Sequence, residues 1–122
     1  MPVVVDLETG GFNCKTDALL EIAAVLVDFN DEGLLQLEET FRFHVAPFEG
    51  ANLEPASLEI TGIDPFHPLR PAIPERDALG RIFSEVRRKL RQAGCKRAVL
   101  VAHNAHFDLG FLNEAIARTG IK

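Results

Sequence analysis

The first third of the chain shows the hydrophobic pattern of β-strands. A short β-branched run, Val3-Val4-Val5, predicts a buried strand. Loosely alternating apolar residues over 18–29 predict a second strand, and a polar turn separates it from a third strand over 34–45. These three segments predict an antiparallel meander.

The middle of the chain changes to helical spacing. Residues 47–74 are rich in proline and predict mostly loop, with a short helix over 53–60. From Pro74 to Gly94, apolar residues recur at the i, i+3, i+4 and i+7 positions of a long amphipathic helix, and glycine is a typical C-terminal stop.

A further strand and helix follow this long helix. Residues 98–102 predict another buried strand, and a last helix is predicted from 105 to 118 with Asn104 as its N-cap. The predicted order is therefore β-β-β-α-α-β-α, which indicates an α/β fold.

Two acids stand directly behind the first predicted strand. Residues two apart in a strand point to the same face, so Asp6 and Glu8 would hold their carboxylates side by side. Two anions about 4 Å apart repel by roughly 4 kcal/mol at an effective dielectric constant near 20. Because no Lys or Arg lies between Met1 and Thr9, a divalent metal held by oxygen ligands is the economical interpretation. Two solvated acids at the surface are the alternative.

Composition narrows the class of protein. The chain has 122 residues, of which 47% are hydrophobic and 25% charged, as is typical of one globular domain. No apolar run approaches the roughly 20 residues that span a bilayer, and no signal peptide is apparent, so we expect no membrane contact. Cys14 and Cys95 have no metal or redox spacing, which indicates reduced thiols in a cytoplasmic protein.

Charge is distributed unevenly along the chain. The formal net charge is −5, yet residues 76–97 contain eight basic and two acidic residues, so this segment carries +6 and the remainder −11. On a helical wheel, Arg81, Arg88 and Arg91 fall opposite the apolar stripe, which predicts a basic surface facing outward. Such a surface suits the phosphates of a nucleic acid, and a merely solvated helix face is the alternative.

A third acid occupies a position comparable to the first two. Asp108 falls within or just beyond the first turn of the last predicted helix, shortly after a predicted strand. The helix dipole stabilises an acid there without any function. However, the ends of buried strands are where the sites of α/β proteins collect, so Asp108 is a candidate to join Asp6 and Glu8.

Taken together, these motifs resemble those of a known superfamily. Asp-x-Glu-Thr-Gly at 6–10 and His-Asn-Ala-x-Phe-Asp at 103–108 are similar to the first two exonuclease motifs of the DEDD superfamily. Within it, the chain most resembles the ribonuclease T family, through the segments 9–24, 43–55, 61–65 and 94–108. The resemblance extends over essentially the whole chain.

The resemblance implies a ribonuclease H-like exonuclease fold, in which helices pack on a mixed sheet of three antiparallel strands and a parallel strand. It implies a 3′-to-5′ exoribonuclease that trims single-stranded 3′ ends of RNA, as in tRNA end turnover and stable-RNA 3′ maturation, and that also acts on DNA ends. By position, Asp6, Glu8 and Asp108 match three of the family's four catalytic carboxylates. In the family these hold two Mg²⁺ ions for two-metal-ion phosphodiester hydrolysis.

The resemblance also implies substrate-binding positions, which are matched here by Thr9, Gly10, Phe12, Phe107, Arg91 and Arg97. The first two belong to a turn whose backbone approaches the 3′ nucleotide, and the two phenylalanines match rings on which terminal bases stack. The two arginines match basic positions that serve the other subunit's active site in the family, so a homodimer is implied.

The chain departs from the family pattern at the third motif. In the family, a His followed five residues later by an Asp supplies the general base and the fourth metal ligand. The one pair here with that spacing, His103 and Asp108, already belongs to the second motif, so no separate third motif is present in this sequence. His106 is a poor substitute, because it lies two residues before Asp108 and about 200° round the helix. Ala56 and Ile60 stand where a Glu and a Phe help hold the substrate in some relatives. We therefore expect residues 1–122 to be one exonuclease domain, truncated before the third motif and cleaving little on its own.

Two other functions remain open from the sequence. A non-catalytic nucleic-acid-binding or dimerisation module would use the basic helix, and its RNA binding would survive the loss of Asp6 and Glu8. An aspartyl-nucleophile phosphatase is suggested by an Asp at a strand's end followed by Thr-Gly, although its second acid is normally Asp rather than Glu.

Overall fold

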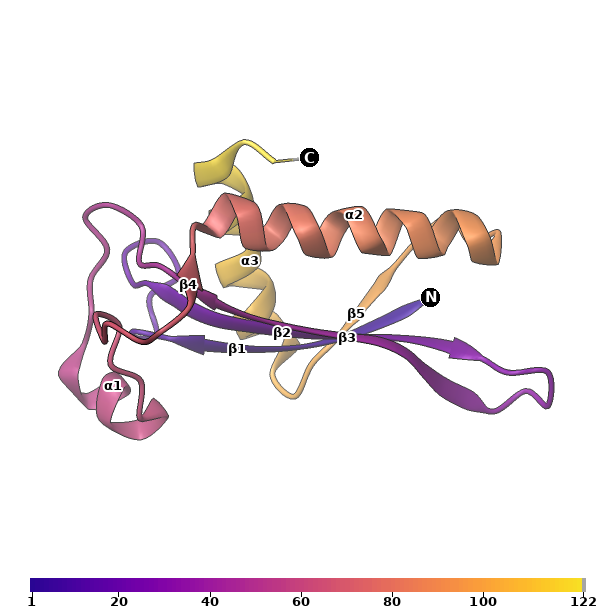
Figure 1. Ribbon diagram of the computed structural model, residues 1–122, viewed down its shortest axis with the longest axis horizontal. Helices are drawn as coiled ribbons and strands as arrows, with labels where there is room; N and C mark the ends of the chain where they lie inside the picture. The colour runs from indigo at the N-terminus through magenta and orange to yellow at the C-terminus, as the bar shows by residue number, and fades with distance from the viewer. Residues whose placement is uncertain (122) are drawn as a thin grey trace.

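The computed structural model describes residues 1–121, which form one five-stranded mixed sheet and three helices. The strand order is β4-β3-β2-β1-β5, with α2 and α3 over one face and α1 beside one end (Figure 1). The elements are β1 (Pro2–Thr9), β2 (Leu19–Phe29), β3 (Leu35–Val45), α1 (Pro55–Thr61), β4 (Ala72–Ile73), α2 (Glu75–Ala93), β5 (Val99–Val101) and α3 (Ala105–Thr119).

The predicted meander and mixed sheet are confirmed. β1 pairs antiparallel with β2 and β2 with β3, which aligns Leu7, Ile22 and Phe43 across the sheet. β5 runs parallel to β1, but the two pair only over Pro2–Val4 and Val99–Val101. Beyond Val4 that edge of β1 therefore has no strand beside it in the part of the chain that the structure describes.

One expectation about strands is incomplete and one is wrong. Residues 47–74 are mostly loop as predicted, but they also contain β4, which pairs in parallel with the end of β3 and is too short to give an alternating pattern. β5 is not a buried strand, because it lies at the sheet edge, where Val99 and Val101 are 59% and 43% exposed.

β1 divides its side chains between a covered and an open face. The odd-numbered residues from Val3 to Leu7 are buried in the core, together with Ile82 of α2 and Phe111 of α3. The even-numbered Asp6 and Glu8 alternate with them, so they point to the face opposite α2 and α3.

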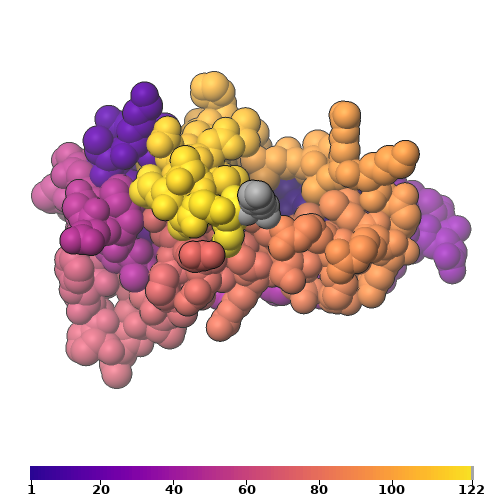
Figure 2. All heavy atoms as spheres, turned by 90° about the horizontal axis from the view of Figure 1, so that it is seen from above, coloured from indigo at the N-terminus to yellow at the C-terminus, as the bar shows by residue number. Residues whose placement is uncertain are grey.

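α2 has the predicted boundaries. Pro74 is its N-cap and Gly94 its C-cap, where a φ of 67° favours glycine. Figure 2 shows α2 and the end of α3 side by side over the sheet, with the tip of the β2–β3 hairpin projecting beyond α2. Within residues 1–121, no helix combines the length and apolar character needed to cross a membrane.

Two of the three arginines predicted to face outward together from α2 contact β3. Arg88 donates to Glu85 on its own helix and to Glu39 on β3, at 2.8 Å for the second pair. The Arg81 guanidinium lies 5.8 Å from the centre of the Phe43 ring. Part of the positive charge of α2 is thus engaged in contacts with β3, and a helical wheel does not show such contacts.

A buried ion pair joins the start of α2 to the end of α3. Glu75 accepts two hydrogen bonds from the Arg118 guanidinium, at 3.1 and 2.7 Å, and its side chain is only 5% exposed. The guanidinium carbon of Arg118 also lies 3.9 Å from the ring centre of Phe48. This contact positions α3, and with it the acid near its other end.

Candidate active site

Asp6 and Glu8 lie side by side near the end of β1, as the spacing predicts. Asp6 is exposed and Glu8 is half-buried on the open face of the sheet. Burial raises the pKa of the Glu8 carboxyl, and the negative charges of Asp6 and Glu21 raise it further. The pair is therefore a site of unfavourable negative charge.

A cation from another strand partly offsets this charge. Glu8 is paired across the sheet with Glu21 of β2. The next row on the same face consists of Asp6 of β1, Ala23 of β2 and Arg42 of β3. Arg42 forms an ion pair with the buried Glu21, and its charge lowers the pKa of Glu8.

The lack of a Lys or Arg close to Asp6 and Glu8 in the sequence was therefore not sufficient evidence for a bound metal. Glu21 and Arg42 were missed because they are contributed by β2 and β3, and the register of the meander is needed to place them. The only sequence signal for their position was the alternation of apolar and polar residues along these two strands.

Asp108 comes to the same region from α3. It lies in the first turn of that helix and is 6% exposed. Burial raises the pKa of its carboxyl, and the charge of Asp6 raises it further, whereas hydrogen bonding from the main chain of Leu7 lowers it. Because β5 stops pairing at Val4, the open edge of β1 leaves room for this contact.

The three acids suit a hard divalent cation in their chemistry. Asp6 acts electrostatically on both Glu8 and Asp108, so the carboxylates share one neighbourhood, and their oxygens are the ligands that Mg²⁺ prefers. Across residues 1–121, no three His, Cys, Asp or Glu side chains converge closely enough to form a finished metal site. The residues therefore fit part of a metal centre.

A tightly bonded turn follows the acids. The Thr9 hydroxyl donates to the carbonyl of Gly11 at 2.7 Å, and the Gly10 amide donates to the carbonyl of Ala18 at 2.8 Å. The Gly10 carbonyl accepts from the amide of Glu54 at 2.7 Å, just before α1. A Cβ on Gly10 would lie 3.0 Å from the Leu53 side chain, so the two segments approach closely.

Beside the acids lies a small cavity of about 180 Å³, called here the aromatic cleft. Its lining includes Glu8, Thr9, Phe12, Ser57, Ile60 and Phe107. The Phe12 and Phe107 rings meet edge to face with centres 6.2 Å apart, and Phe107 rests on Phe111 at 4.9 Å. Phe12 is nevertheless 82% exposed, so its ring is presented to solvent.

Other predicted residues lie apart from this cleft. Arg91 and Arg97 are exposed at and beyond the end of α2, and neither is among the described residues that line the cleft. His106 contributes to a neighbouring cavity of about 340 Å³, which shares Phe12 and Phe107 with the cleft. Of the two departures from the family pattern, Ile60 lines the cleft and is 80% exposed, while Ala56 does not line it.

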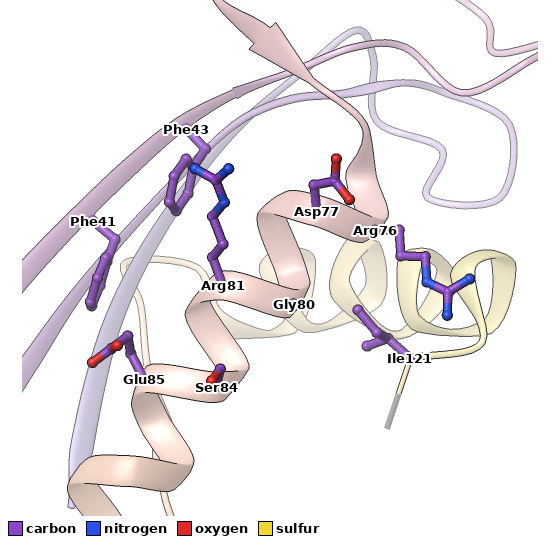
Figure 3. A pocket seen from close by; sticks show the side chains of 9 residues that line it. All are labelled: Phe41, Phe43, Arg76, Asp77, Gly80, Arg81, Ser84, Glu85 and Ile121. Carbon is purple, nitrogen blue, oxygen red and sulfur yellow. The ribbon is translucent and has the colours of Figure 1, made fainter.

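A cavity of about 740 Å³, larger than the two beside the aromatic rings, lies between β3 and α2 (Figure 3). Phe41 and Phe43 form one wall, and Arg76, Arg81 and their neighbours on α2 form the other. None of the site residues predicted from the sequence lines it. Cavity size alone would therefore have directed attention away from the acids.

Comparison with known proteins relates the chain to exonucleases. A family model described as "Exonuclease" matches residues 3–122. The chain is 59% identical over 121 residues to the ribonuclease T of Photorhabdus laumondii subsp. laumondii, covering 99% of this chain and 56% of that protein. It is 58% identical to the ribonuclease T of Yersinia enterocolitica, with the same coverage. The chain thus spans about half the length of these curated relatives.

Solved structures confirm the exonuclease fold. E. coli exonuclease I in complex with a dA16 oligonucleotide aligns with a TM-score of 0.73 and 21% identity, covering 97% of this chain and 24% of that one. Its complex with a dT13 oligonucleotide gives the same values. The zinc-bound form of an exonuclease I complex with single-stranded DNA aligns with a TM-score of 0.74 and 22% identity, covering 97% of this chain and 23% of that one.

Proposed function

Because the chain belongs to the exonuclease family that includes ribonuclease T, we propose that it contributes most of the active site of a 3′-to-5′ exonuclease that trims single-stranded 3′ ends. RNA ends are the proposed substrate, as in tRNA end turnover and stable-RNA maturation, with DNA ends also accepted. Residues 1–122 form one exonuclease domain in this proposal. The observation that carries it is the junction of three carboxylates with a solvent-open aromatic cleft.

The acids are assigned to cation binding. Asp6, Glu8 and Asp108 would hold divalent ions, of which Mg²⁺ is the proposed identity, since their oxygens are hard donors and their charges repel one another. A bound metal pair supplies activation of the attacking water and stabilisation of the leaving 3′ oxygen. The chain's own contribution is to hold the carboxylates at the end of β1 and the start of α3.

The substrate residues are assigned by their position around the cleft. Phe12 and Phe107 would stack the terminal bases, which tolerates many sequences, as a trimming enzyme requires. Thr9 and Gly10 would bring rigid backbone against the 3′ nucleotide. Arg91 and Arg97, which lie away from this cleft, would bind RNA leading to the active site of a second subunit in a cytoplasmic homodimer.

Two measurements test this proposal. First, Mg²⁺ should raise the melting temperature of the chain, and Asp6→Asn should reduce that rise while raising the melting temperature in EDTA, because like-charge repulsion is relieved. Second, a chain extended to the length of the relatives should shorten a 5′-labelled single-stranded RNA from its 3′ end. Asp108→Asn should abolish that shortening, whereas the 122-residue chain should cleave little. Efficient Mg²⁺-dependent trimming by the short chain would contradict the incomplete site.

A non-catalytic nucleic-acid-binding or dimerisation role is the second candidate. It is favoured by the net charge of +6 over residues 76–97, which include most of α2 and the segment that follows it. In that case RNA binding would weaken steeply with salt and would be unchanged by Asp6→Ala and Glu8→Ala. Loss of 3′-end binding in those two variants would exclude it.

A further inference from the structure

The Asp17 carboxylate is an unusual feature of the turn between β1 and β2. The residue is only 4% exposed. Its Oδ2 accepts from the amide of Asn13 at 2.9 Å, and its Oδ1 accepts from the Thr16 hydroxyl at 3.0 Å and from Asn52 Nδ2 at 2.9 Å. A Cβ on Gly11 would lie 2.0 Å from Oδ2, so this position excludes any side chain.

These bonds join the two walls of the aromatic cleft. One wall is the turn that carries Phe12, and the other begins at Asn52 and continues into α1, which carries Ile60. The main chain adds bonds from the Ala18 amide to the Asn52 carbonyl at 3.0 Å and from the Asn52 amide to the Thr16 carbonyl at 2.8 Å. Asp17 thus lies where the two walls meet.

The turn holds an exposed aromatic ring beside buried, hydrogen-bonded groups. Fixing a residue's backbone costs about 1–2 kcal/mol, and a buried carboxylate adds a desolvation cost. Cys14 of the turn packs against the core, whereas Phe12 close to it is 82% exposed, so the Phe12 ring contributes little to offsetting this cost. An arrangement that fixes an exposed ring in place is understandable if the ring must meet a ligand.

We propose that Asp17 is a positioning residue of the aromatic cleft, which sets the spacing between the Phe12 ring and the α1 wall so that a terminal base finds its stacking surface already in place. This inference rests on the proposed function. It adds that a carboxylate distant from the metal-binding acids controls the recognition of the 3′ end. Asp17 itself need not touch the substrate.

The test measures binding of the 3′ end by the 122-residue chain. The probe is a short single-stranded DNA with 2-aminopurine at its 3′-terminal position and phosphorothioate linkages that resist cleavage. A second oligonucleotide carries the same base at an internal position. Asp17→Ala should raise the Kd reported by the terminal probe by about tenfold, the size expected for losing one stacking contact. The internal probe should change by less than about twofold. Asp31→Ala, an exposed acid in the β2–β3 turn, is the matched control.

An exchanged pair separates positioning from simple loop stability. In Asp17→Asn, an amide must face the Asn52 amide or the Asn13 N–H, so terminal binding should weaken. Asn52 Nδ2 also donates to Glu54 Oε1 at 2.7 Å, so a carboxylate at position 52 needs a neutral neighbour at position 54. In Asp17→Asn/Asn52→Asp/Glu54→Gln, the new side-chain amide in the turn can donate to the new carboxylate opposite it, and its carbonyl can still accept from the Asn13 N–H. Terminal binding should then return to within about threefold of the original chain.

Each outcome is decisive. Unchanged terminal binding in Asp17→Ala and Asp17→Asn overturns the inference and leaves the proposed function intact. If Asp17→Ala does not fold, the exchanged pair decides: recovery of the melting temperature without recovery of terminal binding assigns Asp17 to stability alone. If the original chain does not distinguish the terminal from the internal probe, both this inference and the proposed 3′-end cleft fail.

Discussion

Replacing Phe12 with alanine gives the sharpest test of the aromatic cleft. Because the side chain is 82% exposed, folding buries less than a fifth of it, and its removal should lower the free energy of unfolding by only about 0.5 kcal/mol. Stacking of a base on one ring contributes roughly 1–3 kcal/mol, which corresponds to a 5- to 150-fold change in affinity. Phe107 remains in place on Phe111 and offers a partial surface, so we expect a loss near the lower end, about tenfold.

The assay is fluorescence anisotropy of a short labelled oligonucleotide with a free 3′ end, combined with a thermal melt of each variant. Phe66→Ala is the matched control, since Phe66 is 74% exposed and is absent from the described lining of the cleft. It should leave both affinity and melting temperature nearly unchanged. Equal losses of affinity in the two variants, or no loss in Phe12→Ala, would refute the assignment of Phe12 as a stacking surface.

Three further changes test other features. Burial raises the pKa of the Asp17 carboxyl, but its hydrogen bonds outweigh this effect and hold the pKa below the ordinary 3.8. Its contribution to stability is therefore present above the unfolded pKa and is lost as pH falls through the folded pKa. Urea unfolding below pH 4 should therefore be less pH-dependent in Asp17→Asn. Arg118→Met should lower the free energy of unfolding by about 3 kcal/mol by leaving Glu75 buried and unpaired, and Glu75→Met/Arg118→Met should recover most of it in the same urea titrations. Ile60→Phe should strengthen 3′-end binding by up to about tenfold in anisotropy without changing the melting temperature, because this side chain is 80% exposed in the cleft.

Local patterns were sufficient to predict the elements that bring the acids together. The period of two placed Asp6 and Glu8 on one face, and the position of Asn104 placed Asp108 in the first turn of α3. Gly94 correctly marked the end of α2. In each case the determining interaction lies within a few residues of the chain, which is the range over which spacing and capping act.

Features that depend on pairing between distant segments were not predictable in the same way. Arg42 reaches the acids only because the register of β2 and β3 aligns it with Asp6, and a single sequence does not display that register. Arg88 was expected to face solvent, yet it pairs with Glu39 of a strand nearly fifty residues away. The Asp17–Asn52 contact was missed for the same reason, since it joins two segments 35 residues apart.

The shortness of β5 has a consequence for the tolerance of the chain to insertions and deletions. Only three residues separate the last paired residue, Val101, from the first residue of α3, so the strand leads almost directly into the helix. Adding one residue to this connection would advance α3 by about 100° about its axis if the buried anchor Phe111 were displaced, or would force the extra residue outward if it were not. In the first case Asp108 would turn away from β1, although no residue of the site would have been substituted. Sequence identity at the acids is therefore a weaker guide to a working homologue than the unaltered length of this connection.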